Sequence, residues 1–258
     1  MLLWAGDARV RNWPLMGSPT MALLIIAGYN YFSLCLGPGL MKNRRPLSIR
    51  PVVLAYNVLT VLVSVYFFVT MLQLSYLRGT AAGSNGLPPY SLFCEGTDNS
   101  SNGIPFLRHF WLYMLSKIAE MMDTVFFVLL KKNSHISFLH VFHHSMAFLT
   151  VWLAVNNGIT GHAALFPVLN SAVHTVMYTY YGLSALPPSL RPNLWWKKYV
   201  TFFQIVQFVI LAFHSAVPLL YECGFPRVMS WIMTTESVVF MWLFLRLCCQ
   251  KFMLRKAD

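Results

Sequence analysis

Long apolar stretches, separated by short polar segments, follow one another along the whole chain. A helix that crosses a bilayer needs about 20 mostly apolar residues. The pattern predicts seven such helices, at residues 21–40, 52–74, 108–130, 137–155, 162–182, 199–220 and 229–250. The third, fourth and fifth contain polar groups, and the fourth and fifth are short for a span. We therefore expect an all-α polytopic membrane protein with seven transmembrane helices, forming a single domain over residues 1–258.

The composition favours the same class. Hydrophobic residues make up 57% of the chain and charged residues only 10%, whereas soluble domains contain about 25% charged residues. An ordinary cytosolic enzyme and a disordered regulator are therefore excluded. The net charge of +11 could suggest a nucleic-acid partner, but on so apolar a chain it is typical of the cytoplasmic rim of a membrane protein. We expect membrane lipid, and no nucleic acid, around this chain.

The basic residues predict the orientation in the membrane. Most Lys and Arg residues lie in the loops 41–51, 131–136 and 183–198 and in the tail after residue 250. Cytoplasmic loops are enriched in Lys and Arg, so the N-terminus is expected in the lumen and the C-terminus in the cytosol. The last four residues, from Arg255 to Asp258, resemble a dibasic endoplasmic-reticulum retrieval signal. A basic tail that only contacts lipid headgroups is the alternative.

Two features of the expected lumenal loops agree with this orientation. Asn99-Ser100-Ser101 is a glycosylation sequon in the loop 75–107. Cys94 lies in the same loop and Cys223 in the loop 221–228, on the side where disulfides persist. We predict a Cys94–Cys223 disulfide, with two free thiols as the alternative.

Ionisable groups inside spans are costly and usually mark function. In the third predicted span, Lys117, Glu120 and Thr124 share a helical face, with Asp123 beside them. Lys117 and Glu120 form either a buried salt bridge that fixes helix packing or part of the chemistry. Asp123 is the better candidate to orient an imidazole.

The next three predicted spans add further polar stripes. His140, His143 and His144 lie on one helical face, which suits metal binding or acid–base and nucleophilic chemistry. Further polar side chains follow at helical spacing, and we expect them to bind substrate or support the site, with His174 among the catalytic groups. Their alternative role is hydrogen bonding between helices. They are Asn170, His174, Tyr178, Tyr181, Gln204 and Gln207.

A diiron centre is not expected, and a single small metal site is the alternative to purely imidazole chemistry. A diiron site needs several histidine boxes, because each imidazole fills one coordination position. The chain contains eight histidines and one cluster of them. We therefore expect the histidines to act as nucleophile and bases.

Four ordered blocks resemble the very-long-chain fatty acid elongases, the ELO family, over essentially the whole chain. The blocks begin at Lys117 (K-I-A-E-M-M-D-T), Phe138 (F-L-H-V-F-H-H), Asn170 (N-S-A-V-H-T-V-M-Y-T-Y-Y) and Thr201 (T-F-F-Q-I-V-Q-F). The resemblance implies six helices in a barrel around an acyl tunnel, with the first helix outside. It also implies that a long-chain acyl-CoA condenses with malonyl-CoA to a 3-ketoacyl-CoA two carbons longer, releasing CO2 and CoA, without a further cofactor.

The resemblance also implies roles for individual residues. His143 would be the nucleophile, forming an acyl-imidazole in a ping-pong route, and His174 would face it across the tunnel. His140 and His144 would be bases or orienting groups held by Asp123 and Glu120. Asn170 or Gln204 would donate to the developing oxyanion or enolate. The lysines expected to bind the CoA phosphates are Lys131, Lys132, Lys197 and Lys198.

Partners follow from the resemblance as well. They include a homodimer or other elongases, and the ketoacyl reductase, dehydratase and enoyl reductase of the elongation cycle in the endoplasmic-reticulum membrane. A proton-coupled transporter could use the same ionisable residues as a relay, and a metal-dependent lipid-modifying enzyme could use the histidine box. These are the two alternative functions.

Overall fold

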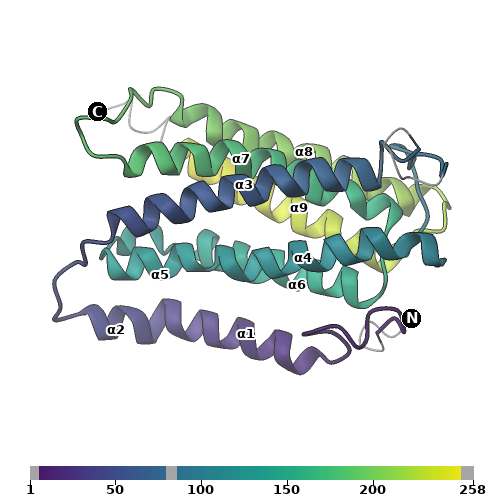
Figure 1. Ribbon diagram of the computed structural model, residues 1–258, viewed down its shortest axis with the longest axis horizontal. Helices are drawn as coiled ribbons and strands as arrows, with labels where there is room; N and C mark the ends of the chain where they lie inside the picture. Colours follow the sequence, from purple (N-terminus) through teal and green to yellow (C-terminus); the bar gives the residue numbers. More distant parts are fainter. Residues whose placement is uncertain (1–5, 80–85, 251–258) are drawn as a thin grey trace. The chain divides into compact units, whose positions relative to one another are not determined.

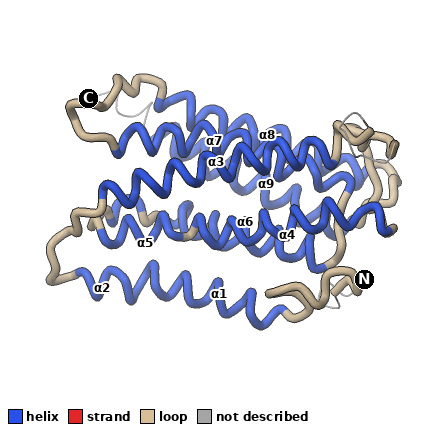
Figure 2. Tube along the Cα trace, in the orientation of Figure 1, coloured by secondary structure: helices blue, strands red, loops and turns tan. Residues whose placement is uncertain are grey.

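The computed structural model describes residues 6–79 and 86–250, and every regular element among them is a helix (Figure 2). The chain divides into two compact units. The first comprises residues 1–50 and 99–159, and the second comprises residues 51–98 and 160–258.

The first unit is built from helices that follow and flank one another. In Figure 1, α4 and α5 succeed each other along the unit, and α6 packs against α4. The helix α1 also packs against α6, and α2 packs against α5. The elements are α1 (Pro19–Tyr31), the π-helical turn Phe32–Leu36, α2 (Gly37–Met41), α4 (Ile104–Glu120), α5 (Met122–Leu129) and α6 (Phe138–Asn156).

A proline explains the π-helical turn between α1 and α2. Pro38 has no backbone N–H, and in a regular helix its ring would collide with the carbonyl of Leu34. The backbone N–H of Gly37 instead bonds to the carbonyl of Phe32, five residues back, which widens the helix just before the proline. The predicted span 21–40 is therefore one continuous helical stretch, Pro19–Met41.

The predicted span 108–130 is interrupted. It begins earlier, at Ile104, and breaks at Met121 into α4 and α5. Around the break the N–H of Met121 bonds to Ile118 O (3.1 Å) and that of Thr124 to Met121 O (3.1 Å). These bonds each span three residues and tighten the helix locally. The break divides Lys117 and Glu120 on α4 from Thr124 on α5.

The second unit contains the remaining long helices. In Figure 1, α8 runs beside α9, and α7 packs against α8. Met177, Tyr178 and Val200 form a small apolar core between α7 and α8. The elements are α3 (Arg50–Leu74), α7 (Leu165–Ala185), α8 (Lys197–Leu220) and α9 (Arg227–Cys248).

Five helical stretches are long and apolar enough to cross a membrane. They are Pro19–Met41, Arg50–Leu74, Phe138–Asn156, Lys197–Leu220 and Arg227–Cys248. Helices also lie at the other two predicted spans, but α4 and α5 are short and α7 contains a polar stripe. The all-helical class is confirmed, and the chain has the segments of a multi-pass membrane protein.

Candidate active site

The histidine box lies at the beginning of α6. Ser137 caps this helix, and its hydroxyl accepts a hydrogen bond from the backbone N–H of His140 (3.2 Å). The ring of His140 lies 4.6 Å from that of His144, and the ring of His143 lies 5.5 Å from that of His144, both edge to face. One turn of helix therefore brings three imidazoles together.

A hydrogen-bonded chain connects this box to two other helices of the first unit. Tyr29 Oη lies 2.8 Å from Thr124 Oγ1, and Thr124 Oγ1 lies 2.9 Å from His140 Nε2. Tyr29 and Thr124 are buried. The sequence pattern predicts Asp123 as the support of an imidazole and assigns no role to Tyr29. The signal for Tyr29 was weak, because it is one of several polar or phenolic side chains in the predicted span 21–40.

Lys117 and Glu120 form a buried ion pair at the end of α4. Lys117 Nζ lies 2.6 Å from Glu120 Oε1, and the two side chains are 4% and 7% exposed. The ammonium also lies 4.4 Å from the centre of the Tyr113 ring, where a cation is attracted to the aromatic face. The geometry therefore shows a buried salt bridge within α4.

Asp123 lies in the first turn of α5 and is half-buried. A carboxylate there is stabilised by the positive end of the helix dipole. The hydrogen bond to an imidazole comes from its neighbour, Thr124.

In the second unit, α7 presents the predicted polar and aromatic stripe. Asn170 Nδ2 lies 3.2 Å from His174 Nε2. Because an amide nitrogen only donates, the ring accepts through Nε2 and its proton sits on Nδ1. The His174 ring lies 5.6 Å from that of Tyr178, which lies 6.0 Å from that of Tyr181. The stripe thus has a polar end at Asn170 and an aromatic end.

Two glutamines of α8 face different surroundings within this unit. Gln204 Nε2 donates to the sulfur of Met177 on α7 (3.3 Å). Gln207 is buried, and among the described residues its Nε2 has no hydrogen-bond partner. Lys197 and Lys198 begin the same helix and are exposed, with Lys198 Nζ 5.1 Å from the centre of the Tyr199 ring. Both lysines can therefore meet an anion.

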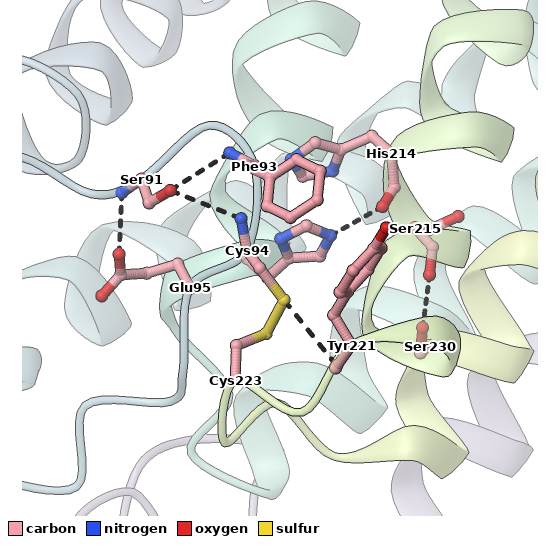
Figure 3. Close-up of a disulfide and its surroundings, with 10 residues drawn as sticks. Ser91, Phe93, Cys94, Glu95, His214, Ser215, Tyr221, Cys223 and Ser230 are labelled. Atoms are coloured by element: carbon pink, nitrogen blue, oxygen red, sulfur yellow. Dashed lines mark hydrogen bonds between the residues drawn. A yellow bond between two sulfur atoms is a disulfide. The ribbon is translucent and has the colours of Figure 1, made fainter.

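A disulfide joins Cys94 to Cys223, with their Cα atoms 5.8 Å apart (Figure 3). It ties the segment after α3 to the turn between α8 and α9, which is the pairing expected from the sequence. Gly161 approaches this region at a positive φ of 57°, and a Cβ there would collide with the carbonyl oxygen of Gly96. Glycine is therefore required at this position.

Two histidines outside the histidine box stack on each other in the second unit. The rings of His162 and His214 are parallel, with centres 3.8 Å apart. His162 Nε2 donates to the carbonyl oxygen of His214 (2.7 Å). Ser230 Oγ donates to Ser215 O nearby, as Figure 3 shows. These contacts fasten the end of α8 to its neighbours within the second unit.

The segment that precedes α1 is hydrogen-bonded to other parts of the first unit. Arg9 donates to Asp7 (2.8 Å), to Gly158 O (3.3 Å) and to Ser100 O (3.1 Å). The Arg9 guanidinium holds the pKa of Asp7 below its ordinary value. Trp152 Nε1, near the end of α6, donates to Leu15 O (2.7 Å). The segment is therefore anchored to the end of α6 opposite the histidine box.

No three His, Cys, Asp or Glu side chains within residues 6–79 and 86–250 converge in a way that could hold a metal ion. The histidine box supplies three imidazoles from one helix, in edge-to-face contact with one another. Each ring is therefore packed against a neighbouring imidazole.

Comparisons with known proteins agree with the resemblance seen in the sequence. A model of the ELO (GNS1/SUR4) family matches residues 14–258. Very long chain fatty acid elongase 4 of Homo sapiens is 39% identical over 241 residues, covering 93% of this chain and 73% of the relative. Elongase 7 of Rattus norvegicus is 40% identical over 248 residues, covering 94% and 85%. Elongase 1 of Mus musculus is 41% identical over 215 residues, covering 83% and 74%. The chain therefore belongs to the ELO (GNS1/SUR4) family.

Proposed function

We propose that this protein is a fatty acid elongase that condenses a long-chain acyl-CoA with malonyl-CoA. The observation that supports this most directly is the cluster of three imidazoles on α6, in a chain whose relatives are named very long chain fatty acid elongases. Imidazole is a competent acyl acceptor. No cysteine lies in the segment that contains the histidine box, so the thiol used by many acyl-transfer enzymes is not at hand there.

The proposed reaction has two halves. A nitrogen of His143 attacks the acyl thioester, the C–S bond breaks, and CoA leaves with the proton. Malonyl-CoA then loses CO2, and the resulting enolate attacks the acyl carbon. The new C–C bond forms as the bond from the acyl carbon to the imidazole nitrogen breaks, and that nitrogen takes up a proton from water, giving a 3-ketoacyl-CoA two carbons longer. His174 faces His143 in this proposal, and Asn170 or Gln204 donates to the developing oxyanion or enolate.

The architecture proposed for this reaction is the seven-span form that the family resemblance implies. Six helices enclose an acyl tunnel, and the first helix lies outside it. The CoA phosphates bind at the cytosolic ends of the spans through Lys131, Lys132, Lys197 and Lys198, of which the last two are exposed at the start of α8. The product then passes to the reductases and dehydratase of the cycle.

We also propose an orientation, with the N-terminus in the endoplasmic-reticulum lumen and the C-terminus in the cytosol. The distribution of Lys and Arg supports it. The Cys94–Cys223 disulfide supports it as well, since disulfides persist in the lumen. Asn99 is exposed at the end of the same segment, so its sequon should accept a glycan.

A pair of serine variants tests this orientation. The sequon requires Ser101 but not Ser100. Ser101→Ala should abolish a mobility shift that glycosidase removes from the wild-type protein, and Ser100→Ala should preserve it. A wild-type protein without any such shift, together with a C-terminal tag protected from protease in sealed microsomes, would contradict the orientation.

The elongase proposal is tested in microsomes that contain the expressed chain. They are given labelled malonyl-CoA and a panel of saturated and polyunsaturated long-chain acyl-CoAs. Product two carbons longer, above the level of an empty-vector control, is expected for at least one acyl-CoA and identifies the preferred substrate. Good expression with no product from any acyl-CoA would contradict the proposal. Proton-coupled flux through the transporter alternative would then be measured.

A further inference from the structure

The chain of hydrogen bonds from Tyr29 to His140 crosses three elements of the first unit. Tyr29 is on α1, Thr124 on α5 and His140 on α6, and the two bonds measure 2.8 and 2.9 Å. Tyr29 and Thr124 are buried. Hydrogen bonds in such surroundings are electrostatically strong, and leaving one unmade is costly.

The direction of these bonds follows from the acidity of the groups. A phenol is a far stronger donor than an alcohol, since its pKa is about 10. We infer that Tyr29 donates to Thr124, whose single hydroxyl proton is then donated to Nε2 of His140. A neutral imidazole that accepts at Nε2 bears its proton on Nδ1. His140 is thereby fixed as one tautomer, with the Nε2 lone pair occupied.

A second contact holds α1 against the same turn of α6. Asn30, the neighbour of Tyr29, donates to Ser145 Oγ (3.0 Å), and Ser145 follows His144. The His144 ring lies 6.3 Å from the Tyr29 ring and 4.6 Å from the His140 ring. The helix α1 therefore contacts two of the three imidazoles, His144 through the Tyr29 ring and His140 through Thr124.

We propose that Tyr29, acting through Thr124, is a positioning residue that holds His140 as the neutral Nδ1–H tautomer and keeps its Nε2 from acting as nucleophile or base. His140 then serves the reaction as a hydrogen-bond donor at Nδ1, and acyl transfer is left to its neighbours. The inference rests on the proposed function and deepens it, because it separates the roles of three adjacent histidines. It also gives α1 a part in the site.

Kinetics of four variants test the proposal. Thr124→Val keeps the shape but removes the hydroxyl, and we expect kcat to fall about thirtyfold with KM for acyl-CoA unchanged. Tyr29→Phe leaves Thr124 able to donate, so the expected loss is about fivefold. Thr124→Ser keeps the hydroxyl and should retain nearly full activity. The matched control is Tyr31→Phe on the same helix, whose side chain is 61% exposed and should not matter.

The double variant Tyr29→Phe/Thr124→Val separates positioning from packing. If Tyr29 acts only through Thr124, the double variant is no slower than Thr124→Val alone. If the losses in kcat of the two single variants multiply in the double variant, the proposal is overturned, because Tyr29 would then act independently of Thr124. Wild-type kcat in Tyr29→Phe would overturn it too. If the melting temperature shows that Thr124→Val does not fold, the kcat values of Tyr29→Phe and Thr124→Ser test the proposal on their own.

A chemical readout distinguishes this proposal from the elongase proposal. Diethyl pyrocarbonate acylates an imidazole nitrogen with a free lone pair, and mass spectrometry locates the modified residue. His140 should react slowly in the wild type and in Tyr31→Phe, and about tenfold faster in Thr124→Val. Equal reactivity of His140 in the wild type and Thr124→Val would overturn the tautomer assignment. An inactive wild type with the expected reactivity would instead contradict the elongase function alone.

Discussion

The hydrogen bonds at His140, in the first unit, and at His174, in the second, differ in the elements that they join. In the first unit the hydrogen bonds cross between helices, from Tyr29 to Thr124 to His140 and from Asn30 to Ser145. In the second unit the corresponding bond, between Asn170 and His174, lies within one turn of α7. The bond to His140 therefore depends on how helices pack, whereas the bond between Asn170 and His174 joins two residues of one helix. Substitutions on α1 or α5 can disturb the first bond, but the second needs only the helical spacing of α7.

The largest expected effect is the loss of condensation on replacing His143. His143→Ala should reduce product to the level of the empty vector, because the proposed acyl carrier is removed. The measurement is the microsomal elongation assay, with expression checked by immunoblot. His109→Ala, on α4, is the control and should remain active. Full activity of His143→Ala would sink the acyl-imidazole route.

The next largest effect concerns the ion pair between Lys117 and Glu120 at the end of α4. Lys117→Met leaves Glu120 buried without its cation and should cost about 3–5 kcal/mol of folding stability. The double variant Lys117→Met/Glu120→Leu removes both charges and should recover most of that loss. Melting in detergent measures both. Equal destabilisation by the single and double variants would show that shape, rather than charge, matters at this position.

A pair of asparagine variants tests the contrast between the units directly. Asn30→Ala breaks a bond between helices, so the melting temperature should fall by a few degrees, the effect of about 1 kcal/mol. Asn170→Ala breaks a bond within one turn, so kcat should fall about fivefold while the melting temperature stays closer to wild type. Thermal melts and initial rates of the same preparations check both. A larger fall in melting temperature for Asn170→Ala than for Asn30→Ala would contradict the comparison.

The smallest effect is expected at the segment before α1. Since the Arg9 guanidinium holds the pKa of Asp7 below its ordinary value, the ion pair stabilises the folded state above the unfolded pKa of about 3.9. That contribution is lost as the pH falls through the lower folded pKa. The melting temperature of Asp7→Asn should therefore be slightly below wild type at neutral pH and converge with it in strong acid. A constant difference across that range would mean that the carboxylate charge contributes nothing.

The sequence alone could predict most of the helices, because the length of each apolar stretch can be read from the residues. Helices lie at all seven predicted positions. The break at Met121 was not predictable, since neither Gly nor Pro marks it and only the tightened bonds at Ile118 and Thr124 reveal it. The π-helical turn had a visible cause in Pro38, but its position depends on which carbonyl the preceding N–H reaches.

The candidate site was predictable where residues share one helix. The grouping of His140 with His144, and of Asn170 with His174, follows from helical periodicity. Contacts between helices were not, because Tyr29 is about a hundred residues away from the group it supports. Thr124 was placed on the right face, but its bond to His140 could not be predicted, because it depends on how α5 packs against α6.

Trapping the acyl group on the enzyme tests the central claim most directly. The purified protein is mixed with acyl-CoA in the absence of malonyl-CoA, and CoA release is followed with a thiol reagent. We predict a burst of CoA equal to the amount of enzyme, and mass spectrometry should find the acyl group on the peptide that contains His143. Adding malonyl-CoA should discharge it as 3-ketoacyl-CoA. CoA release only after malonyl-CoA is added, with no acylated histidine at any time, would contradict the account.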